Sequence, residues 1–410
     1  MTDFHAHVAL GESRTPVGQL RYTHAGPRQF SVFSYAAAWV KDPRAFPLQP
    51  DLPLEGGPFH ASGQSGNVRD ALTGAFSDAA PDVWGRTLLE RTYGSGLSEF
   101  EYLTLSDDTC RQGALRFLDD RGEVIRGNAP DAFPRLVDLQ AITSIARAYE
   151  QGQEVSAADL QRLAGAGGSG GARPKANVVD NGTLWLAKFT SVYDRQPIEQ
   201  VEVATLRLAA ACGLRAPEVR LELTDTPFPV ALIKRFDRQG TGRIPYISAR
   251  TALGKTGTTL GSYTEIADFI RMAGADPRED FRELYSRLIF TILVSNKDDH
   301  LKNHGFLYVG SNKWRLSPLF DVNPAPDRNP HLETAILEGG SHDRSIRLAL
   351  EASEFFEVNQ ADARQIIREM ARRISAEWRD ALRSTGVTGS LAKHYEPAFT
   401  HTESELALGI

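Results

Sequence analysis

The sequence predicts an α+β fold in which a smaller strand-rich part comes first and a larger helical part follows. Strand-like segments prevail before about residue 260 and helical ones after about residue 262, with polar clusters where the two patterns meet. Apolar residues make up 41% and charged residues 24% of the 410 positions, a globular balance that allows a sizeable core. We therefore expect a bilobal protein of two or three domains, with a small N-terminal β-rich subdomain and a mostly helical C-terminal lobe.

The first third of the chain reads as short strands followed by broken helices. The runs HVAL, GQLRYT and QFSVFSYA, separated by Gly, Pro and Ser, predict strands up to about residue 35. Residues 42–58 are rich in Pro and predict an extended loop. Apolar spacing over 68–92 predicts a helical region broken near Pro81, and GALRFL and GEVIRG predict a strand pair.

The middle of the chain combines helices with a strong hairpin signal. Helices are expected at about 134–150 and 156–163, and the glycine-rich stretch AGAGGSGG follows at 164–171. The run KANVVDNGTLWLAKF predicts a tight hairpin around Asp180, Asn181 and Gly182. A helix over 198–212 that ends at Gly213 precedes two expected strands, VRLEL and PVALIKRF.

The last third is predicted to be mostly helical. YTEIADFIRMAG and DFRELYSRLIFTILVSN predict helices, which are interrupted by the polar loop KDDHLKN and by a hairpin, GFLYV–GSN–KWRLS. A long helix is expected over about 360–384, with one apolar face formed by Ile366, Ile367, Met370, Ile374 and Trp378.

Charge and cysteine content exclude several classes of protein. The formal net charge of −6 argues against a dedicated nucleic-acid coat protein, although a local basic patch stays open. The two cysteines cannot form a disulfide scaffold or a four-ligand zinc site, which favours a reducing cytoplasm. The start MTDFHAHVAL lacks signal-peptide features, and the longest apolar run, Leu288–Val294, is too short to span a bilayer. We expect a cytoplasmic protein without a membrane partner.

The glycine-rich stretch matches G-x-G-x-x-G from Gly165 to Gly170. A dinucleotide site needs a strand before and a helix after this motif, and here the order is reversed. A flexible linker and a flap whose amides cover nucleotide phosphates both remain open. Lys175 and the hairpin that follows favour phosphate binding.

Lys188 lies in the second strand of the predicted hairpin, where a solvated lysine would be the ordinary interpretation. A strand lysine that binds phosphates needs a carboxylate on the next helix to fix it, and Glu202 or Glu199 could supply one. Either glutamate could equally be an ordinary surface residue.

The segment SNKDDHLKNHGFL is the strongest functional signal. Asp298 with Asn303 five residues later has the spacing of a catalytic loop, in which the Asp orients a hydroxyl and the Asn binds a metal. A hairpin then returns the chain to Asp321, so that Asn303 and Asp321 could share Mg²⁺. A solvated capping turn at Asp298 and a turn residue before Pro324 are the plain alternatives, but the order of all these features is that of a kinase.

The chain resembles the HipA family of bacterial serine/threonine kinases, the toxins of persistence-associated toxin–antitoxin modules. GGARPKA and DDHLKNHGFL carry the resemblance, together with VGQLRYT, LPL, FSDAAPDVWGR, ALIKRFDR and LSPLFDV. It implies a bilobal protein-kinase-like fold with an N-terminal HipA-type subdomain (1–125), a nucleotide-binding lobe (126–260) and a helical catalytic lobe (261–410).

The resemblance also implies roles for single residues. Asp298 would be the catalytic base, Asn303 and Asp321 would bind Mg²⁺, and Glu202 and Lys302 would support the site. ATP would be bound by Gly170, Gly171, Ala172, Arg173, Pro174, Lys175, Lys188, Lys234, Arg235, Phe236, Asp299, His300 and Phe320.

Family members phosphorylate a protein, a glutamate–tRNA ligase in the best-known case, and pair with a helix-turn-helix antitoxin that supplies most of the DNA reading. They also carry a regulatory serine in the glycine loop. Here that position falls on Gly168, so Ser169 becomes the candidate for autophosphorylation. Two other interpretations stay open: a catalytically weak kinase-fold protein that regulates transcription with a helix-turn-helix partner, and a small-molecule kinase.

Overall fold

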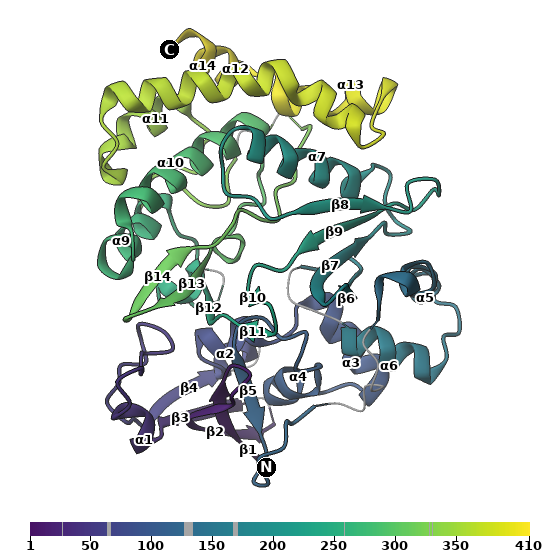
Figure 1. The fold of residues 1–410 in the computed structure, drawn as a ribbon, viewed down its shortest axis with the longest axis vertical. Helices are drawn as coiled ribbons and strands as arrows, with labels where there is room; N and C mark the ends of the chain where they lie inside the picture. Colours follow the sequence, from purple (N-terminus) through teal and green to yellow (C-terminus); the bar gives the residue numbers. More distant parts are fainter. Residues whose placement is uncertain are drawn as a thin grey trace. The chain divides into compact units, whose positions relative to one another are not determined.

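The computed structural model describes residues 1–26, 28–63, 67–126, 134–166, 171–257, 259–327, 329 and 331–410. The chain divides into two compact units (Figure 1). Unit 1 contains Met1–Val192, Lys234–Thr258 and Leu307–Asn312, and unit 2 contains Tyr193–Ile233, Thr259–Phe306 and Lys313–Ile410. The chain therefore enters each unit more than once.

Unit 1 begins with a five-stranded antiparallel sheet in the order β4-β3-β2-β1-β5. Its strands are β1 (Thr2–Leu10), β2 (Thr15–Ala25), β3 (Arg28–Tyr35), β4 (Phe59–Gly63) and β5 (Leu115–Leu118). Buried and accessible residues alternate along β3, as expected of a sheet with one covered face. The three strands predicted before residue 36 are confirmed.

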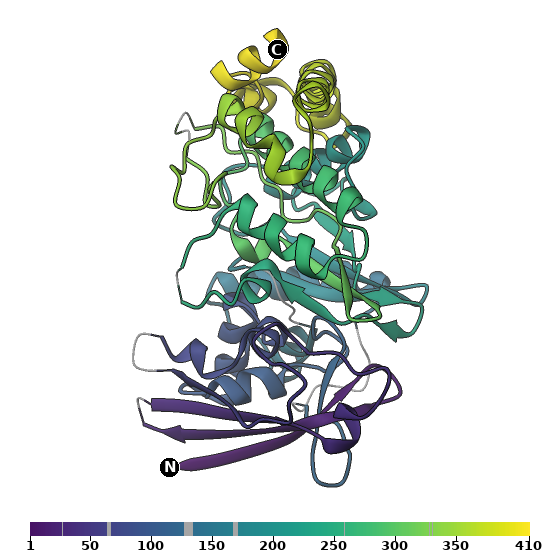
Figure 2. The ribbon, with the colours of Figure 1, turned by 90° about the vertical axis from the view of Figure 1, so that its left-hand side faces the viewer.

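Short helices cover one face of this sheet, which Figure 2 shows as blue helices on one side of the purple strands. They are η1 (Val68–Ala71), α2 (Gly74–Ala79), α3 (Val83–Tyr93) and α4 (Glu99–Leu105), while the short helix α1 (Ala37–Val40) follows directly after β3. Phe76 of α2 lies between Phe33 and Phe117 of the sheet, at ring-centroid distances of 5.2 and 6.1 Å. The predicted break near Pro81 is confirmed between α2 and α3, whereas α4 was not predicted.

The predicted strand pair GALRFL and GEVIRG is only half right. The first segment is β5, but the second makes a single bridge, between Leu118 and Val124. Asp119 explains this, because its side chain accepts hydrogen bonds from the N–H groups of Arg121 and Glu123 and closes a tight loop. The N–H of Ile125 still donates to the carbonyl of Phe117 at 2.9 Å, so the chain returns beside β5 without forming a second strand.

Two helices and a hairpin follow: α5 (Leu139–Glu150), α6 (Ala157–Ala166), β6 (Lys175–Asp180) and β7 (Thr183–Phe189). Asn181 and Gly182 both have positive φ, 47° and 77°, as the predicted tight turn requires. The helix expected from residue 134 instead begins with a short 3₁₀ turn, η2 (Leu136–Asp138), and becomes α-helical at Leu139. The cause is a bridge between Arg135 and Val179, which holds the preceding backbone extended.

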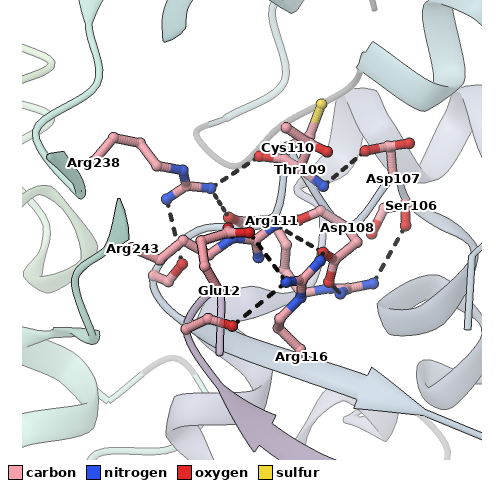
Figure 3. A network of polar contacts seen from close by, with 12 residues as sticks. Glu12, Ser106, Asp107, Asp108, Thr109, Cys110, Arg111, Arg116, Arg238 and Arg243 are labelled. Carbon is pink, nitrogen blue, oxygen red and sulfur yellow. Dashed lines mark hydrogen bonds and ion pairs between the residues drawn. The ribbon is translucent and has the colours of Figure 1, made fainter. Parts of the chain in front are cut away.

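The second stretch of unit 1 is fastened to the first by arginine–carboxylate contacts (Figure 3). It contains β10 (Arg238–Gln239), β11 (Gly242–Arg243), β12 (Tyr246–Ser248) and α8 (Ala249–Ala252). The carboxylate of Asp108 lies 2.6–2.7 Å from guanidinium nitrogens of Arg111, Arg116 and Arg243. These side chains are almost wholly buried, so the contacts tie β11 to the loop before β5.

Unit 2 is mainly helical, as predicted. Its helices are α7 (Ile198–Ala211), α9 (Tyr263–Ala273), α10 (Pro277–Val294), η3 (Leu301–Asn303), α11 (Ile346–Glu351), η4 (Ala352–Phe356), α12 (Gln360–Ser384), α13 (Gly389–Phe399) and α14 (Thr402–Gly409). Helix α10 begins at Pro277 behind the capping residue Asp276 and is buried over most of its length. The predicted apolar face of α12 is confirmed, since all five of its residues are buried.

The structure also contains two further pairs of neighbouring strands. β8 (Val219–Glu222) pairs antiparallel with β9 (Val230–Lys234). The hairpin of β13 (Gly305–Gly310) and β14 (Lys313–Leu316) turns at Ser311 and Asn312, which both have positive φ. The N–H of Ser317 donates to the carbonyl of Gly305 at 2.8 Å, so the chain returns to where the hairpin began, as predicted. Within the described ranges, no helix combines the length and apolar character needed to cross a membrane.

Candidate active site

The glycine-rich segment leads directly into β6. Gly170 and Ser169 lie outside the described residues, while Gly171 and Ala172 are exposed and Arg173 is half-buried. The carbonyl of Pro174 accepts a hydrogen bond from the N–H of Phe189 (2.9 Å), which extends the hairpin ladder to the end of this segment. The exposed residues Gly171 and Ala172 therefore lie next to a strand end whose backbone is hydrogen-bonded to β7.

Lys175 lies inside unit 1, with a side chain only 1% exposed. Its ammonium is 2.8 Å from a carboxylate oxygen of Asp82 and donates to the carbonyl of Gly171 at 3.0 Å. Asp82 also caps α3, and the indole N–H of Trp84 on that helix donates to the carbonyl of Lys175 (2.9 Å). The end of the glycine-rich segment is thus anchored to α3.

Lys188 of β7 faces Lys175 across the hairpin and is 7% exposed. Such burial is unusual for a lysine on a solvated face, which disfavours the plain interpretation of this residue. Glu202 and Glu199 on α7 in unit 2 are each 2% exposed, so they are not ordinary surface glutamates. The pairing of Lys188 with Glu202 stays a prediction.

In the segment Lys234–Phe236, the side chain of Arg235 is 10% exposed and fully engaged in contacts. The guanidinium of Arg235 contacts the carboxylate of Asp237 (2.6 Å), the carbonyl of Cys110 (3.0 Å) and the amide oxygen of Asn177 (2.8 Å). Lys234 is exposed. Arg235 therefore holds this segment against β6 and the 106–113 loop, and nucleotide contact by its side chain would require these bonds to break.

The catalytic-loop candidate in unit 2 is closed by its own asparagine. Helix α10 ends at Ser295, which has a left-handed backbone (φ 55°). The side-chain N–H of Asn303 donates to the carbonyl of Asp298 at 2.8 Å, and its backbone N–H donates to the carbonyl of His300 at the same distance. This explains the five-residue spacing, because the two residues close one turn of chain.

Asp298 is exposed, and its surroundings raise the pKa of its carboxyl. Partial desolvation is the main cause, and the nearby carboxylates of Asp321 and Glu333 add to it. The charge of His300 acts in the opposite direction. The charge of Asp321 thus contributes to the raised pKa of Asp298, and a shared role of the two residues at one site stays a prediction.

Asp299 points into the core of unit 2 rather than to its surface. It is 3% exposed, accepts a short hydrogen bond from the hydroxyl of Tyr263, and lies 3.1 Å from Nε2 of His304. Burial by itself raises the pKa of Asp299, but His304 and the Tyr263 hydroxyl outweigh it and lower the pKa. The side chain thus anchors the loop, and nucleotide contact by it stays a prediction.

The remaining predicted residues of unit 2 differ in exposure. His300 is half-buried, and its buried Nδ1 has no hydrogen-bond partner within the described ranges. Phe320 is half-buried and Lys302 is exposed. Asp321 is half-buried with a left-handed backbone (φ 56°), which is uncommon for a residue with a side chain.

Asn303 and Asp321 fit a magnesium ion by the chemistry of their donors. The amide nitrogen of Asn303 is engaged by Asp298, which leaves the amide oxygen as its ligand atom. The carboxylates of Asp321 and Glu333 add to the desolvation that raises the pKa of Asp298, so negatively charged groups lie near this loop. The described residues contain no group of three or more His, Cys, Asp or Glu that could hold a metal. A magnesium site in a kinase does not need such a cluster of protein ligands, since Mg²⁺ is often bound by one or two carboxylates and substrate phosphates.

Several supporting residues were not predicted. Thr334 donates from its hydroxyl to the carbonyl of Asp299 (2.5 Å), and the N–H of Glu333 donates to the carbonyl of Lys297 (3.1 Å). Asp82, Asn296 and Asn323 were missed as well. Asn296 and Asn323 could have been noticed for lying two residues from Asp298 and Asp321, whereas nothing local marks Thr334.

The comparisons with known proteins agree with the motifs. The sequence model of the HipA-like C-terminal domain matches residues 167–378, and that of the HipA N-terminal domain matches residues 7–117. "Putative kinase Y4mE" of Sinorhizobium fredii is 27% identical over 332 residues, which cover 74% of this chain and 75% of that protein. A "Putative kinase" of Haemophilus influenzae is 30% identical over 144 residues, 31% of this chain and 42% of that protein.

The fold has a relative among solved structures. HipA of Shewanella oneidensis, solved with HipB and its operator DNA, aligns over 99% of this chain and 98% of its own, with a TM-score of 0.70 and 16% identity. At this identity the likeness concerns the fold, and it confirms the α+β class.

Proposed function

The chain belongs to the HipA family, and from this premise we propose that it is an ATP- and Mg²⁺-dependent serine/threonine protein kinase of the toxin type. The loop of unit 2 is the observation that carries the proposal. There Asn303 holds the carbonyl of Asp298, while Asp298 and Asp321 interact through their charges. A base, a metal-binding amide and a metal-binding carboxylate are the groups that phosphoryl transfer requires.

In this proposal Asp298 accepts the proton of the substrate hydroxyl. Its raised pKa makes it a better proton acceptor than an ordinary carboxylate. Asn303 and Asp321 would hold Mg²⁺, which neutralises charge on the phosphates when bound. Lys188 and the backbone of residues 170–174 would bind phosphates, Glu202 would orient Lys188, and Lys302 would face the transferred group. Lys175 would act by anchoring the glycine-rich segment.

The substrate and partner are part of the proposal. The acceptor would be a serine or threonine of a protein such as glutamate–tRNA ligase, and Ser169 would be a second acceptor within the chain. A helix-turn-helix antitoxin would neutralise the kinase and supply contact with DNA. Support comes from the Shewanella relative, which was solved with HipB and operator DNA.

The test is transfer of labelled phosphate from γ-labelled ATP by the purified chain, with host lysate as the source of acceptors. We expect labelled protein bands with the wild type and a loss of at least a hundredfold with Asp298→Asn, because general-base catalysis contributes about 10²–10⁴-fold. Asp380→Asn is the matched control, since it removes an exposed carboxylate of unit 2 from α12.

The outcomes separate the competing functions. Equal labelling by the wild type and Asp298→Asn would reject the assigned site. Label only in small molecules would favour a metabolite kinase, and no transfer despite antitoxin-dependent DNA binding would favour a transcriptional regulator. Phosphopeptide mapping of the labelled chain would show whether Ser169 is modified.

A further inference from the structure

Two asparagines join the loop that carries Asp298 to the loop that carries Asp321. The side-chain oxygen of Asn296 accepts a hydrogen bond from the backbone N–H of Asn323 at 3.1 Å. The neighbouring backbones also pair, because Asn296 forms an antiparallel bridge with Pro324, and the residues on either side are joined by a further backbone bond of 3.0 Å. The loops are therefore held together two residues before Asp298 and two residues after Asp321.

The side chain of Asn323 continues this path to Asp321. Its amide nitrogen Nδ2 lies 3.3 Å from Oδ1 of Asp321. The opposite amide orientation would place an oxygen against the carboxylate, so hydrogen-bond chemistry identifies the nitrogen as the facing atom. One hydrogen-bonded path thus runs from the side chain of Asn296 through Asn323 to the carboxylate of Asp321.

This hydrogen-bonded path leaves one buried polar atom on each of its two asparagines without a partner among the described residues. Asn296 is 1% exposed, and its Nδ2 has no hydrogen-bond partner in the described ranges. The Oδ1 of Asn323 is also buried and has no partner in the part of the chain that the structure describes. Unpaired buried polar atoms are unfavourable, so each one needs an explanation. The left-handed backbone of Asp321 offers an explanation for keeping these atoms unpaired. Such a backbone conformation persists only where neighbouring contacts hold it, and the asparagine path supplies contacts of this kind.

We propose that Asn296 and Asn323 are positioning residues that set the orientation of Asp321 toward Mg²⁺ and its place beside Asp298. This inference rests on the proposed function, because it assigns Asp321 to the metal. Residues that hydrogen-bond a metal-ligating carboxylate typically change metal affinity by 10–100-fold when they are removed.

The first test titrates Mg²⁺ at saturating ATP with Asn296→Ala and Asn323→Ala. Each variant should raise the half-maximal Mg²⁺ concentration by roughly tenfold or more and leave the KM for the protein acceptor unchanged. The double variant should differ little from the stronger single variant, because both remove parts of one path. Asn359→Ala is the control: Asn359 caps α12, so its loss reduces stability and should leave the Mg²⁺ requirement unchanged.

The second test does not depend on activity. Amide hydrogen exchange over residues 319–326 should be at least about tenfold faster in Asn296→Ala than in the wild type, because the N–H of Asn323 loses its acceptor. Exchange over α12 should not change. Asn359→Ala should give the reverse pattern, with faster exchange only at the start of α12.

The results distinguish failure of this inference from failure of the proposed function. If the wild type transfers phosphate and both variants keep its Mg²⁺ requirement, the positioning role is wrong and the kinase assignment stands. If the wild type transfers nothing, the kinase assignment and the metal role fail together. Unchanged exchange at 319–326 in Asn296→Ala would overturn the hydrogen-bonded path in either case.

Discussion

Lys175 anchors the end of the glycine-rich segment to helix α3. Its buried ammonium is paired with Asp82, and its carbonyl accepts the indole N–H of Trp84. The two partners of this ion pair are 93 residues apart in the sequence. A lysine beside a glycine-rich stretch resembles a phosphate ligand, and nucleotide binding by Lys175 stays a prediction, whereas its contacts with Asp82 and Trp84 support the fold.

We expect Asp82→Asn to reduce the free energy of unfolding by roughly 3 kcal/mol, because it leaves a buried ammonium without its carboxylate. Asparagine keeps the cap of α3, so the loss would report on the ion pair alone. Chemical denaturation measures the change. The control is Asp276→Asn, which alters the capping residue of α10 in the same way.

The pair can also be removed as a whole. The double variant Asp82→Asn with Lys175→Met should recover much of the stability, since replacing a buried ion pair by an apolar side chain is often tolerated. If Asp82→Asn is no more destabilising than Asp276→Asn, the ion pair is not a significant source of stability.

The candidate site was predictable from the sequence where its contacts are local. The spacing of Asp298 and Asn303 implied a closed loop, and the structure closes it with a direct hydrogen bond. The partners of Lys175 and Arg235 could not be predicted in this way. Asp82 lies 93 residues from Lys175, and Cys110, one of the partners of Arg235, lies 125 residues from it; no periodicity or spacing encodes such contacts.

At the scale of elements, local chemistry predicted most of the fold. The turn at Asn181 and Gly182 and the apolar face of α12 follow from turn preferences and helical period. Helices α13 and α14 were missed. Pro397 lies inside α13, where proline usually ends a helix. Trp378 of α12 stacks on Phe399 at 4.9 Å, and such packing is invisible to local patterns.

His401 makes the junction between α10 and α14 sensitive to acid. Its Nδ1 accepts the N–H of Ser404, and its Nε2 lies 3.3 Å from the carbonyl of Leu293, an arrangement that suits a neutral ring. Burial, and next the charge of Arg344, lower the pKa of His401 to about 4, although backbone hydrogen bonds oppose this. The folded state therefore binds the proton less readily than the unfolded state.

Since the pKa is lowered on folding, the stability from neutral His401 is present above about pH 6.5 and is lost as the pH falls toward 4. The loss should approach about 3 kcal/mol. We expect His401→Asn, which keeps an acceptor for the N–H of Ser404, to show a correspondingly smaller decrease in stability over this range. Chemical denaturation at several pH values between 7 and 4 measures the free energy of unfolding of both proteins.

His394→Asn is the control, because His394 is an exposed histidine of the adjacent helix α13. It should keep the pH dependence of the wild type. Parallel stability curves for the wild type and His401→Asn between pH 7 and 4 would show that protonation of His401 does not destabilise the fold.

At the scale of the whole molecule, unit 1 is assembled from separate stretches of chain. Asp237, in the second stretch, is 1% exposed and contacts the guanidinium groups of Arg235 (2.6 Å) and Arg238 (2.7 Å). It also accepts the N–H of Gly113 at 2.7 Å, which belongs to the first stretch. These charges lower the pKa of Asp237, although burial alone would raise it. Its carboxylate therefore holds the two stretches together.

We expect Asp237→Ala to destabilise unit 1 by about 3–5 kcal/mol, because it leaves two buried guanidinium groups without their carboxylate. Amide exchange should become faster over residues 106–116 and 235–248 and stay unchanged over α12 of unit 2. Asp42→Asn is the control, since its ion pair with Arg44 is largely exposed and should contribute little. If amide exchange in Asp237→Ala became equally faster in both units, the contacts of Asp237 would support the molecule as one cooperative body. If exchange did not become faster in either unit, other contacts would hold the second stretch in place.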